Sequence, residues 1–259
     1  MENSLSPASI THNLTTHFIG KKVIYYPQLT STMRVAKREA RQGTAEGTVV
    51  IAGEQTAGKG RIKRTWLSPK GSIALSIILY PDAVYLPYLI MLASLAVIHS
   101  IKTSTNLKSR VKWPNDILLN GKKVCGILIE NEVRGNVIDH AVIGIGINAN
   151  LKLADFPEIS PLATSLSDEL GRAVSRLDII SLLLAEVEKL YTAVLSGESI
   201  YEEWRDSLVT LGRRVQVKSG KTGYHEGIAE SVSKDGSLLL RQPDGSLTKI
   251  VAGDVTILK

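Results

Sequence analysis

Short β-branched apolar runs alternate with longer helical patterns through most of the chain. Runs of this kind predict buried strands at residues 22–26, 48–52, 72–80 and 137–148. The spacing of apolar positions and the helix-forming residues predict helices at residues 33–42, 88–101, 161–170, 177–195 and 200–208. Ser31 and Thr32 are suited to cap the first of these helices. The mixture predicts an α+β domain in which strands and helices share one core.

A hairpin is predicted in the middle of the chain. Asn120-Gly121 is a strong two-residue turn signal, and apolar residues flank it in the stretch LLNGKKVCGILIE. A short strand at residues 111–113 precedes the hairpin and is interrupted by Pro114, which cannot donate to a sheet. The strand at residues 137–148 is expected to pair with this hairpin.

The character of the chain changes at Gly212. From there on, short β-rich segments are separated by Gly-, Asp- and Ser-rich turns such as Lys234-Asp235-Gly236, a pattern typical of a small β-barrel. The chain is therefore expected to divide into an N-terminal tail at residues 1–20, a large α+β domain at residues 21–211 and a small β-barrel domain at residues 212–259.

Composition places the chain among ordinary globular proteins. It has 259 residues, of which 44% are hydrophobic and 22% charged. No apolar run approaches the roughly 20 residues that span a bilayer, and the first residues lack the pattern of a secretory signal. The single cysteine, Cys125, lies in an apolar run and is predicted to be a buried, unreactive thiol. A cytoplasmic protein without membrane attachment is expected.

Net charge adds one question. A charge of +6 is compatible with nucleic-acid binding, although basic residues spread over a solvated surface give the same total. One cluster is dense, because Lys59, Arg61, Lys63 and Arg64 follow the strand predicted at residues 48–52, with Trp66 close behind. This local concentration of cations needs its own chemical explanation.

The cationic cluster lies in a glycine-rich loop, AGEQTAGKGRIKRTW at residues 52–66. Gly53, Gly58 and Lys59 reproduce most of a Walker A motif, but Gly60 stands where that motif needs a hydroxyl for Mg²⁺. Glycines let the backbone approach a ligand, and the cations can neutralise phosphate or carboxylate oxygens. From these residues alone, an anion-binding loop and a mobile basic surface loop both stay open.

Three more features combine polar residues with unusual backbone requirements. In the stretch KWPND at residues 112–116, Asn115 and Asp116 can reach a ribose, a phosphate or Mg²⁺, although a turn that closes a strand is the simpler interpretation. Lys123 stands at the entry of a strand, where a lysine usually faces solvent. Gly144-Ile145-Gly146 interrupts a strong strand and indicates close approach of backbone or ligand. The five histidines are scattered without the spacing of metal ligands.

Together these stretches resemble the biotin–protein ligases. The motifs that carry the resemblance are residues 30–32, residues 54–61 continuing to Trp66, and residues 112–116, 123–130 and 144–148. Their order and spacing fit that family from residue 20 or so to the end. The resemblance implies a catalytic domain related to the class II aminoacyl-tRNA synthetases, with a mixed sheet, followed by a barrel of the Src-homology-3 type.

The resemblance also implies a biotin–[acetyl-CoA-carboxylase] ligase reaction. Biotin and ATP, with Mg²⁺, form biotinyl-5′-AMP, and a lysine of a biotin carboxyl carrier domain then takes the biotin. The implied catalytic residues are Lys123, Arg61 and Lys112. The implied biotin contacts are Ser31, Thr32, Met33, Gln55, Gly58, Lys59, Gly60, Arg61, Lys123, Gly126 and Gly144. The implied nucleotide contacts are Arg61, Arg64, Trp66, Asn115, Asp116 and Asn148, and the protein ligands of the metal are unknown.

Three positions depart from the family pattern, one of them Lys63, which stands where many members have glycine. Met33 stands where the family has asparagine, so an amide is missing from the first biotin-contacting turn. Lys59 replaces an arginine between the loop glycines, which keeps the charge but loses bidentate geometry. Some relatives carry an N-terminal helix-turn-helix domain, but only about 20 residues precede the first predicted strand here, so specific DNA binding is not expected.

Two other functions compete with this interpretation. A lipoate–protein ligase shares the fold and the adenylation chemistry, but the basic loop followed by KWPND argues against it. A nucleic-acid-binding protein would use the basic loop and the barrel, yet it leaves Gln55 and the Gly-Ile-Gly strand unexplained. The oligomeric state stays open: the family includes homodimers, and an exposed strand edge near residues 137–147 is a candidate interface.

Overall fold

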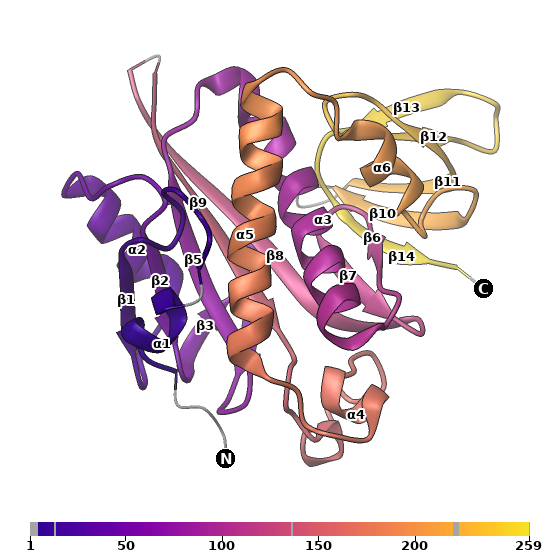
Figure 1. The fold of residues 1–259 in the computed structure, drawn as a ribbon. Coiled ribbons are helices and arrows are strands. Elements are labelled where there is room, and N and C mark those ends of the chain that lie inside the picture. The colour runs from indigo at the N-terminus through magenta and orange to yellow at the C-terminus, as the bar shows by residue number, and fades with distance from the viewer. Residues whose placement is uncertain (1–4, 13, 136, 220–222, 259) are drawn as a thin grey trace.

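The computed structural model describes residues 5–12, 14–135, 137–219 and 223–258. Two sheets organise these residues (Figure 1). The larger sheet has seven strands in the order β1-β2-β5-β9-β8-β7-β6. Their bounds are Val23–Tyr26 (β1), Val49–Ala52 (β2), Ile73–Leu79 (β5), Arg110–Lys112 (β6), Asp116–Leu119 (β7), Lys122–Arg134 (β8) and Val137–Ile147 (β9). β1 and β2 are parallel and the other neighbouring pairs are antiparallel, so the sheet is mixed, as predicted.

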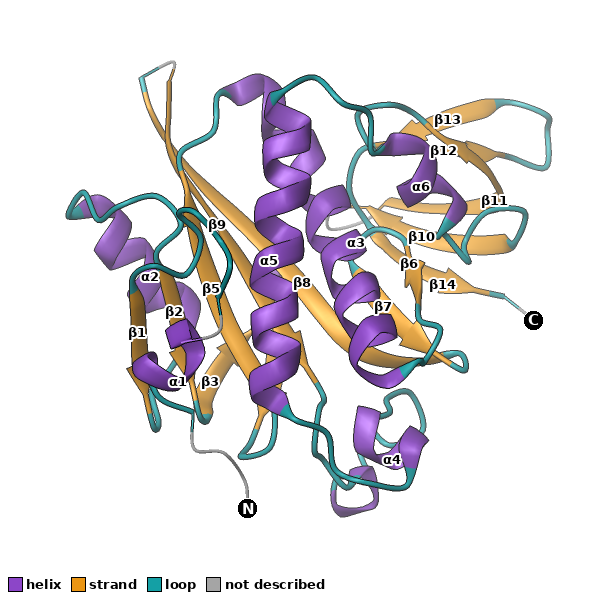
Figure 2. Cartoon of the chain, in the orientation of Figure 1, coloured by secondary structure: helices purple, strands orange, loops and turns teal. Residues whose placement is uncertain are grey.

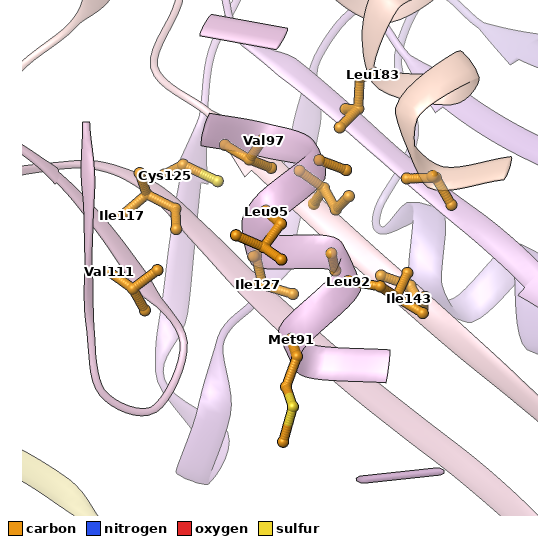
Figure 3. Packing of buried hydrophobic residues seen from close by; sticks show 14 of the residues in the cluster. Met91, Leu92, Leu95, Val97, Val111, Ile117, Cys125, Ile127, Ile143 and Leu183 are labelled. Atoms are coloured by element: carbon orange, nitrogen blue, oxygen red, sulfur yellow. The ribbon is translucent and has the colours of Figure 1, made fainter. Parts of the chain in front are cut away.

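Two long helices, α3 (Leu86–Thr105) and α5 (Arg176–Leu195), cover one face of this sheet and pack against each other (Figure 2). Alternate residues of the strands enter the core beneath them, among them Ile73, Leu75, Ile77, Ile143, Ile145 and Ile147. Figure 3 shows part of this core, with Leu92 and Leu95 of α3 near Ile127 of β8. α3 is long and apolar enough to cross a membrane by composition, but its burial against the sheet and α5 makes it a core helix.

The opposite face of the sheet is covered only in part. There, α2 (Thr32–Arg41) packs Met33, Ala36 and Ala40 against the other set of alternating strand residues, Val50, Ile78 and Val142. The predicted loop at residues 52–66 also lies at this face, but the prediction of an irregular loop was wrong. It forms a hairpin of β3 (Gln55–Lys59) and β4 (Thr65–Ser68), joined by the short helix η1 (Arg61–Lys63).

The second sheet is antiparallel, with the strand order β13-β12-β11-β10-β14. Its strands are Arg214–Ser219 (β10), Gly223–Val232 (β11), Leu238–Arg241 (β12), Leu247–Ile250 (β13) and Asp254–Ile257 (β14). We call residues 212–258 the C-terminal module. It contacts the larger sheet through Trp113, whose Nε1 donates to the Gly236 carbonyl at 2.8 Å, and contacts α6 (Tyr201–Asp206) through a bond from the Tyr201 hydroxyl to the Val232 carbonyl.

Several details refine the sequence predictions. Asn120 and Gly121 have φ angles of 47° and 80°, as the predicted two-residue turn requires. The helix predicted at residues 161–170 is shorter: α4 spans Leu166–Leu170, because the Ser165 hydroxyl caps it by accepting from the Asp168 amide. The segment predicted as a tail contains α1 (Pro7–His12), whose Ile10 is buried in the core.

Strand β9 offers only part of the exposed edge predicted near residues 137–147. From residue 141 to residue 147 it pairs with β5 on one side and with β8 on the other. That part of the strand has no unpaired edge through which a second chain could extend the sheet.

Candidate active site

A cavity lies on the partly covered face of the seven-stranded sheet, bounded by α2, the β3–β4 hairpin and the C-terminal module. It brings together all but two of the residues predicted as a site. Those that line it are Ser31, Thr32, Met33, Gln55, Lys59, Gly60, Arg61, Arg64, Trp66, Lys112, Asn115, Asp116, Lys123, Gly126 and Gly144.

The two predicted residues outside the cavity lining are Gly58 and Asn148. Gly58 is buried within the hairpin, where a Cβ would lie 2.4 Å from the Trp66 carbonyl oxygen. Asn148 is 4% exposed, and its side-chain amide donates to the Thr164 carbonyl at 3.0 Å. Gly58 therefore shapes the hairpin, and the Asn148 amide nitrogen holds a neighbouring loop.

Glycines form the floor of the cavity because other side chains occupy the space above them. A Cβ on Gly144 would lie 2.6 Å from Met33 Sδ, and a Cβ on Gly146 would lie 2.3 Å from Trp66 Nε1. On the neighbouring strand, a Cβ on Gly126 would lie 3.0 Å from Cζ3 of the same indole. Gly146 was absent from the predicted site, although its alternation with Gly144 on one face of β9 was a usable signal.

One end of the cavity is polar and uncharged. Gln55 Oε1 accepts from the Thr32 amide at 2.8 Å and lies 3.2 Å from the Thr32 hydroxyl, and that hydroxyl in turn accepts from Ser76. The buried Ser31 hydroxyl has no hydrogen-bond partner among the described residues. Thr32 and Gln55 thus hold each other, while the Ser31 hydroxyl is available to a ligand.

The other end is strongly cationic. Lys123 Nζ lies 2.5 Å from Asp116 Oδ1 and 5.3 Å from the centre of a Trp66 ring, so this lysine turns into the cavity rather than toward open solvent. Arg61 Nη1 donates to Asn115 Oδ1 at 2.8 Å, and the Asn115 amide donates to the Ile127 carbonyl. Asn115 therefore orients Arg61.

Burial makes two of these cations unusual. It lowers the pKa of Lys112 below its ordinary value, although attraction to Asp116 opposes the shift. It also lowers the pKa of Arg61, with Asp254 and Asp116 acting in the opposite direction. Both groups have been partly removed from water, so an anion that enters the cavity meets cations that are poorly solvated.

The C-terminal module contributes Asp254 and Val255 to the cavity wall. Asp254 pairs with Arg64 through a short hydrogen bond, and the Gly253 carbonyl accepts from Arg61 Nη1 at 3.2 Å. Sequence reasoning missed Asp254, because nothing in the surrounding strand pattern marks it. Among the described residues, His, Cys, Asp and Glu side chains do not gather in threes to form a metal site.

Comparison with known proteins agrees with this geometry. Residues 25–148 match the biotin/lipoate A/B protein ligase family, and residues 210–258 match the biotin protein ligase C-terminal domain. The chain is 36% identical to the bifunctional ligase/repressor BirA of Bacillus subtilis, covering 98% of this chain and 79% of that protein. It is 34% identical to the biotin–[acetyl-CoA-carboxylase] ligase of Paracoccus denitrificans, covering 78% of this chain and 88% of that protein.

Among solved structures, biotin protein ligase from Aquifex aeolicus in complex with biotin and ATP superimposes with a TM-score of 0.77. The sequence identity is 27%, and the match covers 92% of this chain and 99% of that one. Fold and cavity thus define a ligase catalytic domain of the class II synthetase type with a small Src-homology-3-like C-terminal domain. The chain belongs to the biotin–protein ligase family.

Proposed function

We propose that the cavity joins biotin and ATP into biotinyl-5′-AMP and then delivers the biotin to a lysine of a carboxylase carrier domain. The observation that carries this proposal is the meeting of a neutral polar end, at Ser31 and Gln55, with a cationic end, at Lys123 and Arg61, in one cavity. A biotin head group needs hydrogen bonds, whereas a carboxylate that attacks a phosphate needs cations.

At the neutral end, we assign the ureido group of biotin to Ser31, Thr32 and Gln55. The free Ser31 hydroxyl and the Gln55 amide nitrogen supply polar contacts there. Gly144 and Met33 form the adjoining wall, where the thioether sulfur contacts the strand backbone in place of the asparagine of other family members. Lys59 and Gly60 line the same cavity from the hairpin.

At the cationic end, Lys123 is assigned to the biotin carboxylate and the α-phosphate, with Arg61, Arg64 and Lys112 as further phosphate contacts. The carboxylate oxygen attacks the α-phosphorus, the bond from the α-phosphorus to the α,β-bridging oxygen breaks, and pyrophosphate leaves with the bonding electron pair. Preorganised cations reduce the repulsion between the two anions and stabilise the charge that develops. Trp66, which lies over Gly126 and Gly146, is assigned to the adenine end with Asp116 and Asn115 nearby.

Charge counting favours magnesium-bound ATP as the substrate. The cavity lining holds five cations and two carboxylates, namely Lys59, Arg61, Arg64, Lys112, Lys123, Asp116 and Asp254, for a formal charge of +3. Biotin carries one negative charge and MgATP carries two, so the pair balances the lining. Free ATP would exceed it, which is why magnesium enters here as part of the substrate.

The second step needs an acceptor amine. A neutral lysine amine of the carrier domain attacks the acyl carbon, the bond to the phosphate oxygen breaks, AMP leaves with its electron pair, and the amine nitrogen gives up one proton to solvent. The hairpin cations stay beside the AMP phosphate and stabilise the leaving group. We assign catalysis to residues 21–211, with the C-terminal module closing the cavity.

The direct test is to incubate the protein with ATP, Mg²⁺, biotin and a biotin carrier domain, and to measure the carrier mass. A gain equal to biotin minus water is expected. The same assay with lipoate and a lipoate acceptor domain tests the rival lipoate–protein ligase. We expect no labelling with lipoate, since residues 210–258 match the biotin protein ligase C-terminal domain. Labelling with lipoate but not with biotin would reverse the assignment.

Finer properties follow as proposals. We propose that the enzyme is cytoplasmic, because ATP and carrier domains are available in the cytoplasm. We also propose that the described residues do not bind operator DNA. The helix before β1, α1, has six residues and buries Ile10 against the core, so it is not a free recognition helix. Specific retention of a biotin-operon operator in a gel-shift assay contradicts this. A homodimer is proposed as well, to be tested by sedimentation with and without biotin and ATP.

A further inference from the structure

Asp254 links the C-terminal module to the two arginines of the β3–β4 hairpin. Its carboxylate pairs closely with Arg64, and its second oxygen lies 4.0 Å from Arg61 Nη1. The preceding residue, Gly253, accepts from the same Arg61 nitrogen at 3.2 Å. The Arg64 and Asp254 positions are 190 residues apart, so this contact exists only because the module docks beside the cavity.

The two sides of this contact differ in rigidity. Asp254 begins β14 and pairs with Lys218 of β10. A Cβ on Gly253 would lie 2.7 Å from Val217 Cγ1 and 3.0 Å from the Lys218 carbonyl oxygen, so the close approach of the strands fixes this segment. The arginines instead flank Ile62, which has a φ of 51° and is 62% exposed. The module is thus the fixed side of the contact, and the hairpin is the adaptable side.

The position of the contact also distinguishes it from an ordinary surface ion pair. The side chains of Asp254 and Arg61 are each only 21% exposed, and both line the cavity. Asn115 and Gly253 accept from Arg61 Nη1, which leaves the hydrogens on Nη2 and Nε for a ligand anion. Arg64, which is more exposed, is directed by Asp254.

We propose that Asp254 is a positioning residue for ATP: with Gly253, it holds Arg61 and Arg64 where they meet the triphosphate. This inference rests on the proposed function. Cations that are already oriented need no reorganisation when the phosphate arrives. Without the carboxylate, the arginines become mobile and ATP binds more weakly. The biotin end, formed by Ser31 and Gln55, is untouched.

The test measures biotin-dependent pyrophosphate exchange, with separate KM values for ATP and biotin, in wild type and in D254N. We expect the KM for ATP to rise about tenfold and the KM for biotin to stay within about twofold. D254E restores the charge one methylene further out and should recover part of the ATP affinity. D244N is the matched control, because Asp244 lies in the same module but bonds to Ser246 in an exposed turn; it should change neither KM.

A second variant tests the contact from the hairpin side. R64Q removes the same ion pair without altering the C-terminal module, and it should also raise the KM for ATP selectively. Because Asp254 acts partly through Arg64, the effects of the two substitutions on the KM for ATP should be less than additive in the double variant R64Q/D254N. A wild-type KM for ATP in R64Q overturns the proposal even if D254N does not fold.

The remaining outcomes are also decisive. An unchanged or lower KM for ATP in D254N overturns the proposal, because the carboxylate is then neutral or competes with phosphate for the arginines. Equal increases in both KM values also overturn it, since they indicate a general architectural defect. Absence of biotin-dependent exchange in the wild type refutes the proposed function itself, whereas an active wild type with an unaffected D254N refutes only the assignment of Asp254.

Discussion

The two faces of strand β9 serve different purposes although they alternate residue by residue. Ile143 and Ile147 enter the core beneath α3 and α5, while Gly144 and Gly146 between them form the floor of the cavity. Strand β8 repeats the pattern, with Cys125 in the core and Gly126 in the cavity. The core face supplies cohesion, and the cavity face supplies room for a ligand because side chains are absent.

This division implies that stability and activity can be changed separately. A substitution on the core face removes packing from the folded state alone, whereas one on the cavity face alters what the ligand meets. The predictions below test that separation, beginning with the largest expected effect.

Replacing Lys123 by alanine should lower the rate of adenylate formation about 10³-fold, or about 4 kcal/mol in the barrier. The ammonium is the cation that stands at 2.5 Å from Asp116 inside the cavity, and its loss leaves the two reacting anions less shielded. The melting temperature should stay near that of the wild type, since the side chain is 32% exposed.

Lys122→Ala is the matched control for Lys123, because Lys122 is the exposed neighbour on the same strand. Pyrophosphate exchange and thermal unfolding should be measured on both variants, so that a loss of activity is distinguished from a loss of stability. Full exchange activity in Lys123→Ala, or an equal loss in Lys122→Ala, would contradict the assignment.

On the core face, Ile143→Ala should lower the free energy of unfolding by about 3 kcal/mol, since Ile143 is 0% exposed and its loss leaves a cavity. Exchange activity per folded molecule should change little. Val137→Ala is the control on the same strand, because that side chain is 69% exposed. Urea unfolding monitored by fluorescence gives the comparison, and an equal effect in the two variants would refute a core role for Ile143.

On the cavity face, Gly146→Ala should raise the KM for ATP about tenfold, or about 1.4 kcal/mol, because its Cβ displaces the Trp66 indole that lies 2.3 Å away. Gly144→Ala should act on biotin instead, since its Cβ meets Met33 Sδ. Steady-state kinetics with each substrate varied in turn check this order. A larger rise for biotin than for ATP in Gly146→Ala argues against the adenine assignment of Trp66.

Much of the difference between the two faces of the sheet could be predicted from the sequence, because it depends on the local pattern of residues. Short β-branched apolar runs predicted β2, β5 and β9, and the Asn120-Gly121 pair predicted the turn before β8. The motifs that resemble those of the biotin–protein ligases likewise predicted most of the cavity lining. Each of these motifs is confined to a short stretch of consecutive residues.

Contacts between distant segments could not be predicted in this way. The hairpin at residues 55–68 lacks a clear alternation of apolar and polar residues. It forms partly because the backbone amides of Thr56 and Ala57, in its first strand, donate to the carbonyls of Leu29 and Thr30. Asp254 reaches Arg64 only through the docking of the C-terminal module. A sequence motif gives the identity of a side chain but not the group to which it bonds. The Asn148 side-chain amide, for example, donates to the Thr164 carbonyl.

The smallest predicted effect concerns the C-terminal module, where a second aspartate supports the fold rather than the cavity. Asp235 accepts from Lys249 at 2.7 Å and from the Ser237 amide at 3.1 Å. The hydrogen bond from Lys249 is the main reason that the pKa of Asp235 falls from its ordinary 3.8 to about 2. A carboxyl with a lower pKa in the folded state contributes stability above pH 3.8, and that contribution is lost as the pH falls toward 2.

Asp235→Asn should therefore reduce stability at pH 7 by less than about 1 kcal/mol, since both partners are half exposed and the pair is screened by salt. The difference from wild type should shrink as the pH falls through 3.8 toward 2. The KM for ATP should not change, in contrast to Asp254→Asn. Urea unfolding at a series of pH values, together with exchange kinetics at pH 7, tests both statements. A deficit that persists unchanged at low pH would show that Asp235 acts through its shape rather than its charge, and a raised KM for ATP would show that the module transmits strain to the cavity.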